Sequence, residues 1–409
     1  MQPQTLKFVQ SKFLEYYQNS FREDALPISL EKREFGALLF KEKTMVRHKS
    51  FSQFNQLRDF LCELVPSDVY YSSAYYENPA VDDMGKKGWA GADLVFDIDA
   101  DHIQTPCGKE HDTWTCSNCH FVGKGITPKE CPSCGSQKIE TKTWICEVCL
   151  ETTKRETEKL LDMLMNDFGF SPDEAQVYFS GHRGYHVHVQ AETVRSFDQA
   201  ARKEIVDYVV GIGLDLTMHG FKSTGGVIFD LTLEGSGWSG RIARGMYDLL
   251  NSSPQELENL GLSKKVVKIL GERKDKILES WKTVGPWNVV KGVGKANWKK
   301  IVQRGVELQS AQIDTVVTTD IHRLIRLANT LHGKTALKKT IVPHGKLERF
   351  DPLKNAVAFE KDVAKVFVRE SPRFRVGDEL YGPFTEQKEE LPMAAALFLL
   401  CKGAAEVVA

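Results

Sequence analysis

The chain has 409 residues, of which 42% are hydrophobic and 27% charged, a globular composition that excludes a disordered or collagen-like protein. Its 54 Lys and Arg against 55 Asp and Glu give a net charge of −1, which excludes a uniformly basic nucleic-acid coat but allows a local basic face. The length suits two domains. No apolar run approaches the about 20 residues that span a bilayer. The N-terminal segment carries too many charges for a signal peptide, so we expect a cytoplasmic protein.

Helical and strand patterns alternate along the first half of the chain. Apolar residues at helical spacing predict helices over 4–20 and 49–65. The run GADLVFDIDA at 91–100 predicts a strand that ends in carboxylates. After a cysteine-rich segment, we expect a helix at about 151–168, and then a strand, a glycine turn and a second strand within 175–189.

Seven of the nine cysteines lie within 107–149. Because nothing indicates secretion, metal ligation is favoured over a disulfide framework. The spacing Cys116-x2-Cys119-x11-Cys131-x2-Cys134 is typical of a zinc ribbon, in which two C-x-x-C turns close a tetrahedron around one ion. Unrelated buried thiols are the much weaker alternative.

Three cysteines remain outside that ribbon pattern, namely Cys107, Cys146 and Cys149. They need a fourth ligand, for which His111 is the nearest candidate, with His102 and His120 as competitors. We predict two nested zinc sites, the four-cysteine ribbon being inserted within the outer one. Both would be structural, because protein ligands fill every position and leave none open for water.

Two aspartates in DLVFDIDAD (93–101) are spaced for one face of a strand. Asp97 and Asp99 are two residues apart, so their side chains point the same way, about 6–7 Å apart along the strand. Asp93 and Asp101 have the same parity and add to the charge on that face. Carboxylates gathered this way favour a divalent metal, although an acidic strand end that meets solvent is the alternative.

The segment SGHRGYHVHV (180–189) has the chemistry of a phosphate-binding turn. It offers glycines for close backbone approach, a hydroxyl, a planar guanidinium and two imidazoles that share a strand face. These residues are Ser180, Gly181, Arg183, Gly184, His186 and His188. The alternative is a polar hairpin with one packed histidine.

A third cluster follows near residue 320. IDTVVTT (313–319) predicts a strand that carries Asp314, and DIHRLIRLAN (320–329) predicts a helix. The cations of this region are Arg323, Arg326, His332 and Lys334. Alone they would favour an amphipathic helix with a solvated basic face. Together with the acidic cluster they fit a nucleotide–metal site, in which carboxylates hold metal ions and cations hold a triphosphate.

The segment 236–305 is helical in pattern and basic. Residues 261–304 contain twelve Lys or Arg against three acidic residues. A nucleic-acid contact and a solvated, lysine-coated surface are about equally good explanations.

Several blocks of the sequence together resemble one family. The blocks are REFGALLF (33–40), MVRHKSF (45–51), DLVFDIDAD (93–101), VYFSGHRGYHVHV (177–189), IDTVVTTDIHRLIRL (313–327), TLHGKT (330–335) and the C-terminal GDELYGPF and LPMAAALFLLCKGAA. They are similar to the catalytic small subunit of archaeal and eukaryotic DNA primases, most closely the archaeal branch.

The resemblance implies roles for individual residues. Its catalytic, metal-binding carboxylates correspond to Asp97, Asp99 and Asp314, while we expect Asp320 to be a helix N-cap. Its triphosphate-binding positions correspond to Arg47, Ser180, Arg183, His186, Arg326 and His332, with Lys334 adjacent. Its zinc motif corresponds to Cys107, His111, Cys146 and Cys149, and the four-cysteine ribbon is an insertion into it.

The resemblance also implies an α/β primase-type core with mixed sheets. The expected domains are a discontinuous core (1–235 and 306–409), a zinc module inserted in it (107–149) and a helical insertion (236–305). The expected reaction is primer synthesis on single-stranded DNA from nucleoside triphosphates, with two Mg²⁺ or Mn²⁺ ions and a large-subunit partner. A primer-extending repair polymerase, a two-histidine phosphoesterase and a non-catalytic zinc scaffold are the alternatives.

Overall fold

The computed structural model describes residues 1–41, 44–103, 105–216, 232–281 and 290–408. Within these ranges the chain packs as two units. The first consists of Met1–Thr157, Pro172–Arg202 and Ile313–Ala409, and the second of Glu158–Ser171 and Lys203–Gln312. No helix in the described ranges is both long and apolar enough to cross a membrane.

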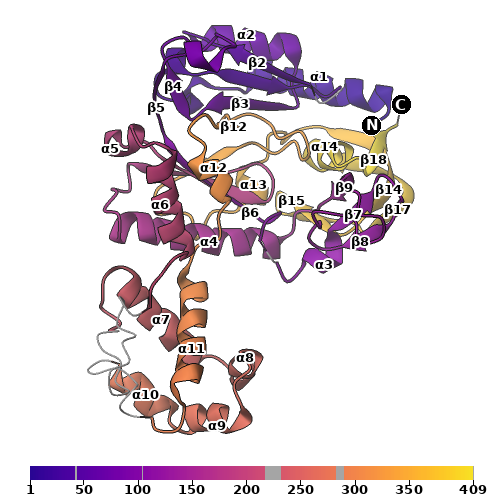
Figure 1. Ribbon diagram of the computed structural model, residues 1–409. Coiled ribbons are helices and arrows are strands. Elements are labelled where there is room, and N and C mark those ends of the chain that lie inside the picture. The colour runs from indigo at the N-terminus through magenta and orange to yellow at the C-terminus, as the bar shows by residue number, and fades with distance from the viewer. Residues whose placement is uncertain (42–43, 104, 217–231, 282–289, 409) are drawn as a thin grey trace. The chain divides into compact units, whose positions relative to one another are not determined.

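The first unit begins with a four-stranded antiparallel sheet. Its strands, in spatial order, are β12 (Leu324–Arg326), β3 (Asp68–Ser72), β1 (Phe35–Leu38) and β2 (Met45–Lys49). Two helices, α1 (Pro3–Asn19) and α2 (Phe54–Leu64), lie together beside it (Figure 1). Val9, Phe13 and Tyr17 form the buried stripe of α1 at the four-residue spacing of an amphipathic helix. The two helices predicted for this region are therefore confirmed.

A second four-stranded sheet carries the residues of interest. Its strands are β13 (Thr340–Val342), β10 (Ala175–Phe179), β11 (Gly184–Val189) and β6 (Leu94–Asp99). The predicted strands at 91–100 and 175–189 are confirmed. The expectation of mixed sheets is wrong, because every pairing in this sheet is antiparallel. The short turn 180–183 joins β10 to β11, and a turn of that length can only join antiparallel neighbours.

The expectation for 313–329 is also wrong, and in both halves. The predicted strand is the helix α12 (Thr315–Thr319), and the predicted helix contains the strand β12. Asp314 begins α12, because its side chain accepts a hydrogen bond from the backbone N–H of Val316 at 3.0 Å. β12 then pairs with β3 through Ile325, which lies opposite Tyr71.

A third sheet contains the last strand of the chain. Its strands are β17 (Phe384–Pro392), β14 (Val363–Ser371) and β18 (Ala405–Val407), and α14 (Met393–Cys401) packs on it. The first unit also contains several short elements: β4 (Ala74–Tyr76), β5 (Trp89–Ala92), α5 (Glu192–Arg195), α13 (Pro352–Asn355), β15 (Phe374–Val376) and β16 (Glu379–Tyr381). The seven buried residues of α14 all have apolar or small side chains. α14 is therefore a core helix rather than a surface helix.

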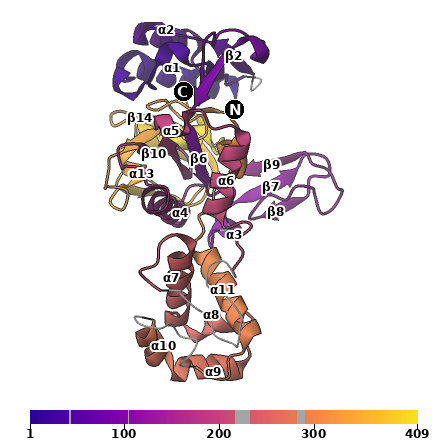
Figure 2. The ribbon, with the colours of Figure 1, turned by 60° about the vertical axis from the view of Figure 1, so that its left-hand side comes forward.

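The cysteine-rich insertion forms a three-stranded sheet that extends away from the other sheets of the first unit (Figure 2). Its strands are β8 (Val122–Lys124), β7 (Thr113–Cys116) and β9 (Ile139–Lys142), preceded by α3 (Gly108–His111) and followed by α4 (Glu147–Asn166). The main apolar residue of this sheet is Trp114. Its ring lies so close to Gly123 that a Cβ on Gly123 would lie 2.1 Å from a ring carbon of Trp114. We call β7, β8, β9 and their turns the ribbon.

The second unit is helical. Its helices are α7 (Gly237–Asn251), α8 (Pro254–Asn259), α9 (Lys264–Glu272), α10 (Lys274–Ser280) and α11 (Lys295–Gln309), together with parts of α4 and of α6 (Gln199–Val210). Gly245 and Gly305 let α7 and α11 pack closely, because a Cβ on Gly245 would lie 2.3 Å from the carbonyl oxygen of Gly305. The unit is wider than the predicted insertion 236–305, of which residues 282–289 lie outside the described ranges.

Candidate functional site

The register of β6 against β11 places the first predicted carboxylates. Asp97 lies directly opposite His186, and Asp99 lies opposite Gly184. The Nε2 atom of His186 is 3.5 Å from Oδ1 of Asp97. A Cβ at Gly184 would lie 2.1 Å from the carbonyl oxygen of Ile98, so only glycine allows the two strands to approach at Asp99.

The third predicted carboxylate lies beside the first. The backbone N–H of Asp314 donates to the carbonyl oxygen of Asp97 at 2.8 Å. Burial first, and then the charges of Asp99 and Asp314, raise the pKa of Asp97 to about 7. Two segments far apart in the sequence therefore bring acidic groups near one another, and the charges of Arg323 and Lys339 offset their repulsion only in part.

The expectation that Asp320 is a helix N-cap is wrong. Asp320 follows the last residue of α12, and its Oδ1 accepts a hydrogen bond from the N–H of His322 at 2.9 Å. No helix begins there, because the chain turns directly into β12. The capping role that the sequence assigned to Asp320 belongs to Asp314.

Arg183 joins the end of β6 to the cysteine-rich insertion. Its guanidinium pairs with Asp101 and, at 2.7 Å, with Asp112, and it is 1% exposed. Asp101 in turn donates its backbone N–H to Oδ1 of Asp99 at 2.8 Å, and Asp112 contacts Nδ1 of His111 at 2.8 Å. A continuous series of polar contacts thus connects a predicted zinc ligand to a predicted catalytic carboxylate, which we call the Arg183 relay.

The other two predicted phosphate-binding arginines are also paired with acidic side chains. The Nε atom of Arg47 is 3.0 Å from Glu34. Arg326 donates to Asp68 at 2.5 Å. Although burial alone would raise the pKa of Asp68, the charge of Arg326 holds it below its usual value.

Three more members of the predicted phosphate-binding set complete this part of the site. Ser180 is buried in the turn between β10 and β11, where its hydroxyl accepts from the N–H of His182 at 3.3 Å. Nδ1 of His332 lies 3.9 Å from Asp68. Lys334 is exposed, and its ammonium has no partner among the described residues. Lys334 is therefore free to bind a ligand.

His188, the second histidine of the HVH motif, is fully buried and already engaged. Its Nδ1 is 3.1 Å from the hydroxyl of Tyr71, and its Nε2 is 3.2 Å from Nζ of Lys339. Burial lowers the pKa of His188 and of Lys339 well below their usual values. With both ring nitrogens taken, His188 cannot act with His186 in a two-histidine phosphoesterase.

The sequence reasoning missed His182 and Lys402. Donor atoms of Asp99, Asp101 and His182 all lie within 4.8 Å of one another, so this group could also hold a metal ion. Nε2 of His182 is 2.9 Å from Nζ of Lys402, whose pKa burial lowers to about 7. A single lysine directly after the apolar run of α14 was the signal that could have identified Lys402.

The outer cysteine cluster has the geometry of a closed metal site. The donor atoms of Cys107, His111, Cys146 and Cys149 lie within 4.8 Å of one another. The sulfurs of Cys107 and Cys149 are 3.3 Å apart, well beyond the about 2.05 Å of a disulfide. Four N and S donors at this spacing fit the edges of a tetrahedron around zinc. Of the three candidate histidines, only His111 belongs to the group.

The inner cluster consists of the four ribbon cysteines, whose sulfurs also lie within 4.8 Å of one another. The sulfurs of Cys116 and Cys134 are 3.6 Å apart, as are those of Cys119 and Cys131. The nested arrangement therefore has the donor sets of two four-coordinate sites, either of which could hold a metal. Cys119 and Cys134 are exposed, whereas Cys107 and Cys149 in the outer cluster are buried.

The sequence matches known proteins over its whole length. Residues 129–342 match the profile of the DNA primase small subunit family. A protein named DNA primase small subunit PriS from Methanothrix thermoacetophila is 33% identical over 100% of both chains. Proteins of the same name from Methanococcoides burtonii and Archaeoglobus fulgidus are each 34% identical, over 99% and 98% of both chains respectively.

Proposed function

Because this chain belongs to the DNA primase small subunit family, it is a nucleotidyltransferase that makes primers, and we propose that three carboxylates hold its catalytic metal ions. These are Asp97, Asp99 and Asp314. Oxygen donors of this kind suit Mg²⁺ or Mn²⁺. Two such ions, when bound, would activate a 3′-hydroxyl and neutralise the leaving pyrophosphate. The position of Asp314 beside Asp97 carries this proposal.

The neighbouring side chains would position the triphosphate. Burial lowers the pKa of His186 well below its usual value, so its ring is neutral and can donate one hydrogen bond to a phosphate oxygen without delivering a proton. His332, Ser180 and Lys334 would supply further donors. Three arginines would contribute to triphosphate positioning partly through the acidic side chains with which they pair. They are Arg47, Arg183 and Arg326. No covalent nucleophile is needed, because positioning and electrostatics lower the barrier.

The two cysteine clusters would each hold one Zn²⁺ in a structural role. Both sets provide four protein donors and leave no coordination position for water. The zinc module would fix the position of Arg183, and through it the end of β6.

The substrates and partners follow from the family. We propose a single-stranded DNA template, nucleoside triphosphates and a large primase subunit, with a cytoplasmic location. The helical second unit would contact template or product DNA through its excess of lysines, and that contact would weaken as salt is raised.

The test is primer synthesis on unprimed single-stranded DNA with labelled nucleotides and Mg²⁺ or Mn²⁺. Short new products support the proposal. Products that form only when an annealed primer is supplied would favour a repair-type primase-polymerase. Cleavage of nucleic acid without incorporation would favour a phosphoesterase.

A further inference from the structure

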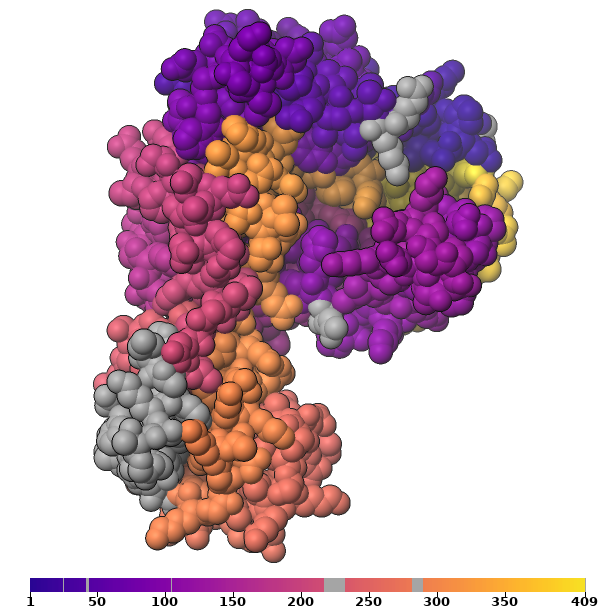
Figure 3. Space-filling view, viewed as in Figure 1, coloured from indigo at the N-terminus to yellow at the C-terminus, as the bar shows by residue number. Residues whose placement is uncertain are grey.

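A cavity of about 800 Å³ opens beside the catalytic strand, within the first unit. Its wall comes from the segment after β6, from α3, from the ribbon and from two residues of the predicted phosphate-binding set, Arg183 and Lys334. The volume is within the about 300–1,000 Å³ usual for small-molecule pockets. Figure 3 shows the surface hollowed between the ribbon (purple) and the segment near residue 330 (orange).

Lysines from separate elements converge on this cavity. Lys109 comes from α3, Lys124 ends β8 and Lys129 lies in the turn that follows. Lys334 lines the same cavity but comes from a distant part of the sequence. The side chain of Lys109 packs against this turn, because a Cβ at Gly125 would lie 3.4 Å from its Cγ. Among the described residues none of the four ammonium groups has a hydrogen-bond or ion-pair partner.

The acids in the wall do not neutralise these lysines. Asp101 and Asp112 both face the cavity, but both pair with Arg183. Nε of Arg183 is buried and has no partner. Hydroxyl groups add neutral donors, since Thr127 and Thr141 line the cavity with their Oγ1 atoms 3.0 Å apart. The cavity therefore presents unneutralised positive charge and donors, which is the chemistry that binds phosphate.

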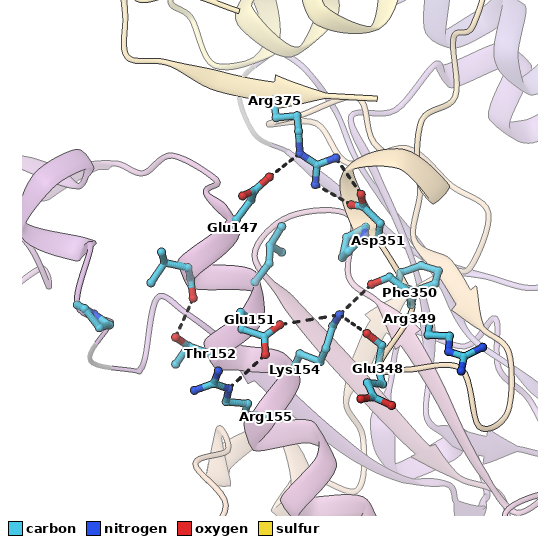
Figure 4. Close-up of a pocket in the computed structure, with 14 residues that line it drawn as sticks. Glu147, Glu151, Thr152, Lys154, Arg155, Glu348, Arg349, Phe350, Asp351 and Arg375 are labelled. Atoms are coloured by element: carbon cyan, nitrogen blue, oxygen red, sulfur yellow. Dashed lines mark hydrogen bonds and ion pairs between the residues drawn. The ribbon is translucent and has the colours of Figure 1, made fainter. Parts of the chain in front are cut away.

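A second cavity provides a comparison, because cations in its wall have partners within the protein. It has a volume of about 640 Å³ and also contains several cations. There Arg375 pairs with Glu147 and Asp351, and Lys154 donates to backbone carbonyl oxygens of the facing loop (Figure 4). Arg375 and Lys154 thus serve the fold, whereas the four lysine ammonium groups at the first cavity have no partner among the described residues.

We propose that the inserted ribbon completes a polyphosphate pocket, in which Lys109, Lys124 and Lys129 bind the phosphate groups of a nucleoside triphosphate together with Lys334. This rests on the proposed function and deepens it, because it gives the ribbon a role in substrate binding. The location favours the incoming nucleotide, since the cavity begins at Ala100, directly after Asp99. The same phosphate chemistry is present in the triphosphate of the initiating nucleotide.

The test compares two double variants that remove the same charge from the ribbon. Lys124→Gln with Lys129→Gln alters the cavity. Lys138→Gln with Lys142→Gln alters exposed ribbon residues that do not line it. We expect the cavity variant to raise the KM for nucleotides about tenfold, equivalent to about 1.4 kcal/mol, with kcat and zinc content retained. The control variant should match the wild type.

Two assays identify which triphosphate is bound. A raised KM in extension of an annealed primer assigns the pocket to the incoming nucleotide. A raised KM confined to synthesis on unprimed template assigns it to the initiating nucleotide, and supports the phosphate pocket equally. Equal KM values for both double variants in both assays would overturn the inference, as would a loss of affinity for template DNA with no change in nucleotide KM.

Binding of inorganic tripolyphosphate, measured by calorimetry, separates this inference from the proposed function. The wild type and the control variant should bind it more tightly than the cavity variant, whether or not primers are made. Equal binding by all three would refute the polyphosphate pocket even in a fully active primase. An inactive wild type that still shows the difference would refute the proposed function alone.

Discussion

The paired strands β6 and β11 and the cysteine-rich ribbon position their functional side chains by different means. In the strand pair, a buried six-residue register aligns Asp97 with His186. The ribbon has three short strands and one main apolar residue, Trp114. Its side chains are positioned by four cysteines that converge on one point.

The difference teaches which changes each region can tolerate. A side chain in the strand pair can be replaced by one of similar shape without loss of the fold, because backbone hydrogen bonds fix its position. A cysteine of the ribbon should not tolerate replacement, because a bound metal would supply the folding energy that the small core of the ribbon lacks. The Arg183 relay joins the two regions, so it should show some of both behaviours.

The largest loss of primer synthesis is expected from substitution of the proposed catalytic carboxylates. Asp314→Asn keeps the shape and the capping of α12 but removes one charge, so the fold should survive while primer synthesis falls by about 10³-fold or more. Asp97→Asn should behave alike, and the double variant should be little worse than either, because the residues act as a unit. Incorporation assays and circular dichroism check both parts.

Asp320→Asn is the matched control for this prediction. Asn can accept the same hydrogen bond from the N–H of His322, so activity should be nearly retained. An inactive Asp320→Asn together with an active Asp314→Asn would mean that the catalytic triad has been assigned to the wrong aspartate.

Replacement of a cysteine by serine should have different effects in the two cysteine clusters. Cys149→Ser removes a buried, proposed zinc ligand at the start of α4 and should lower both thermal stability and activity severely. Cys131→Ser should remove one of two zinc equivalents and unfold the ribbon, while the rest of the first unit melts near its usual temperature. Metal analysis and thermal melts test this, and loss of both zincs from Cys131→Ser would contradict independent sites.

The Arg183 relay should give a smaller effect that is mainly on turnover. Arg183→Lys keeps the charge but cannot pair with Asp101 and Asp112 at once. We expect kcat to fall about 10²-fold, as for a displacement of about 1 Å in the site, with nucleotide KM nearly unchanged. Arg369→Lys, at an exposed pair with Glu406, is the control. An increase in KM alone would instead make Arg183 a direct phosphate ligand.

The smallest expected effect is a change of metal affinity with pH. Because burial and the charges of Asp99 and Asp314 raise the pKa of Asp97 to about 7, this carboxyl holds a proton below that pH. A metal ion must displace the proton, so Mn²⁺ affinity should fall up to tenfold per pH unit below 7 and level off above it. Calorimetry at several pH values measures this. Asp97→Asn should flatten the slope, and a flat wild-type profile would contradict the assignment.

Features that depend on local spacing were predictable from the sequence. The period of two in β6 put Asp97 and Asp99 on one face, and the C-x-x-C spacing identified the inner cysteine cluster. His111 was the nearest of three histidines to the outer cluster, and it is the one in the group. In each of these cases the neighbours that decide the structure are close in the sequence.

Features that depend on distant contacts were not predictable. The β-branched run 315–319 forms a helix because Asp314 caps it and bonds to the backbone of Asp97. The segment that follows has helical spacing, yet β12 forms because β3 offers a free edge. Tertiary contacts override local propensity in both cases. Asp93 likewise had the parity of the acidic face, but it pairs with Arg33 in the core at 2.7 Å.

The first unit is assembled from three separate stretches of chain, and this has a consequence for the order of biosynthesis. A ribosome makes Asp97 and Asp99 early, then the whole helical second unit, and only afterwards Asp314 and β12. The helical unit can fold during translation, since domains generally fold as units. If Asp314 completes the proposed metal site, the nascent chain should neither bind the metal pair nor polymerise until residues beyond 313 have left the ribosome.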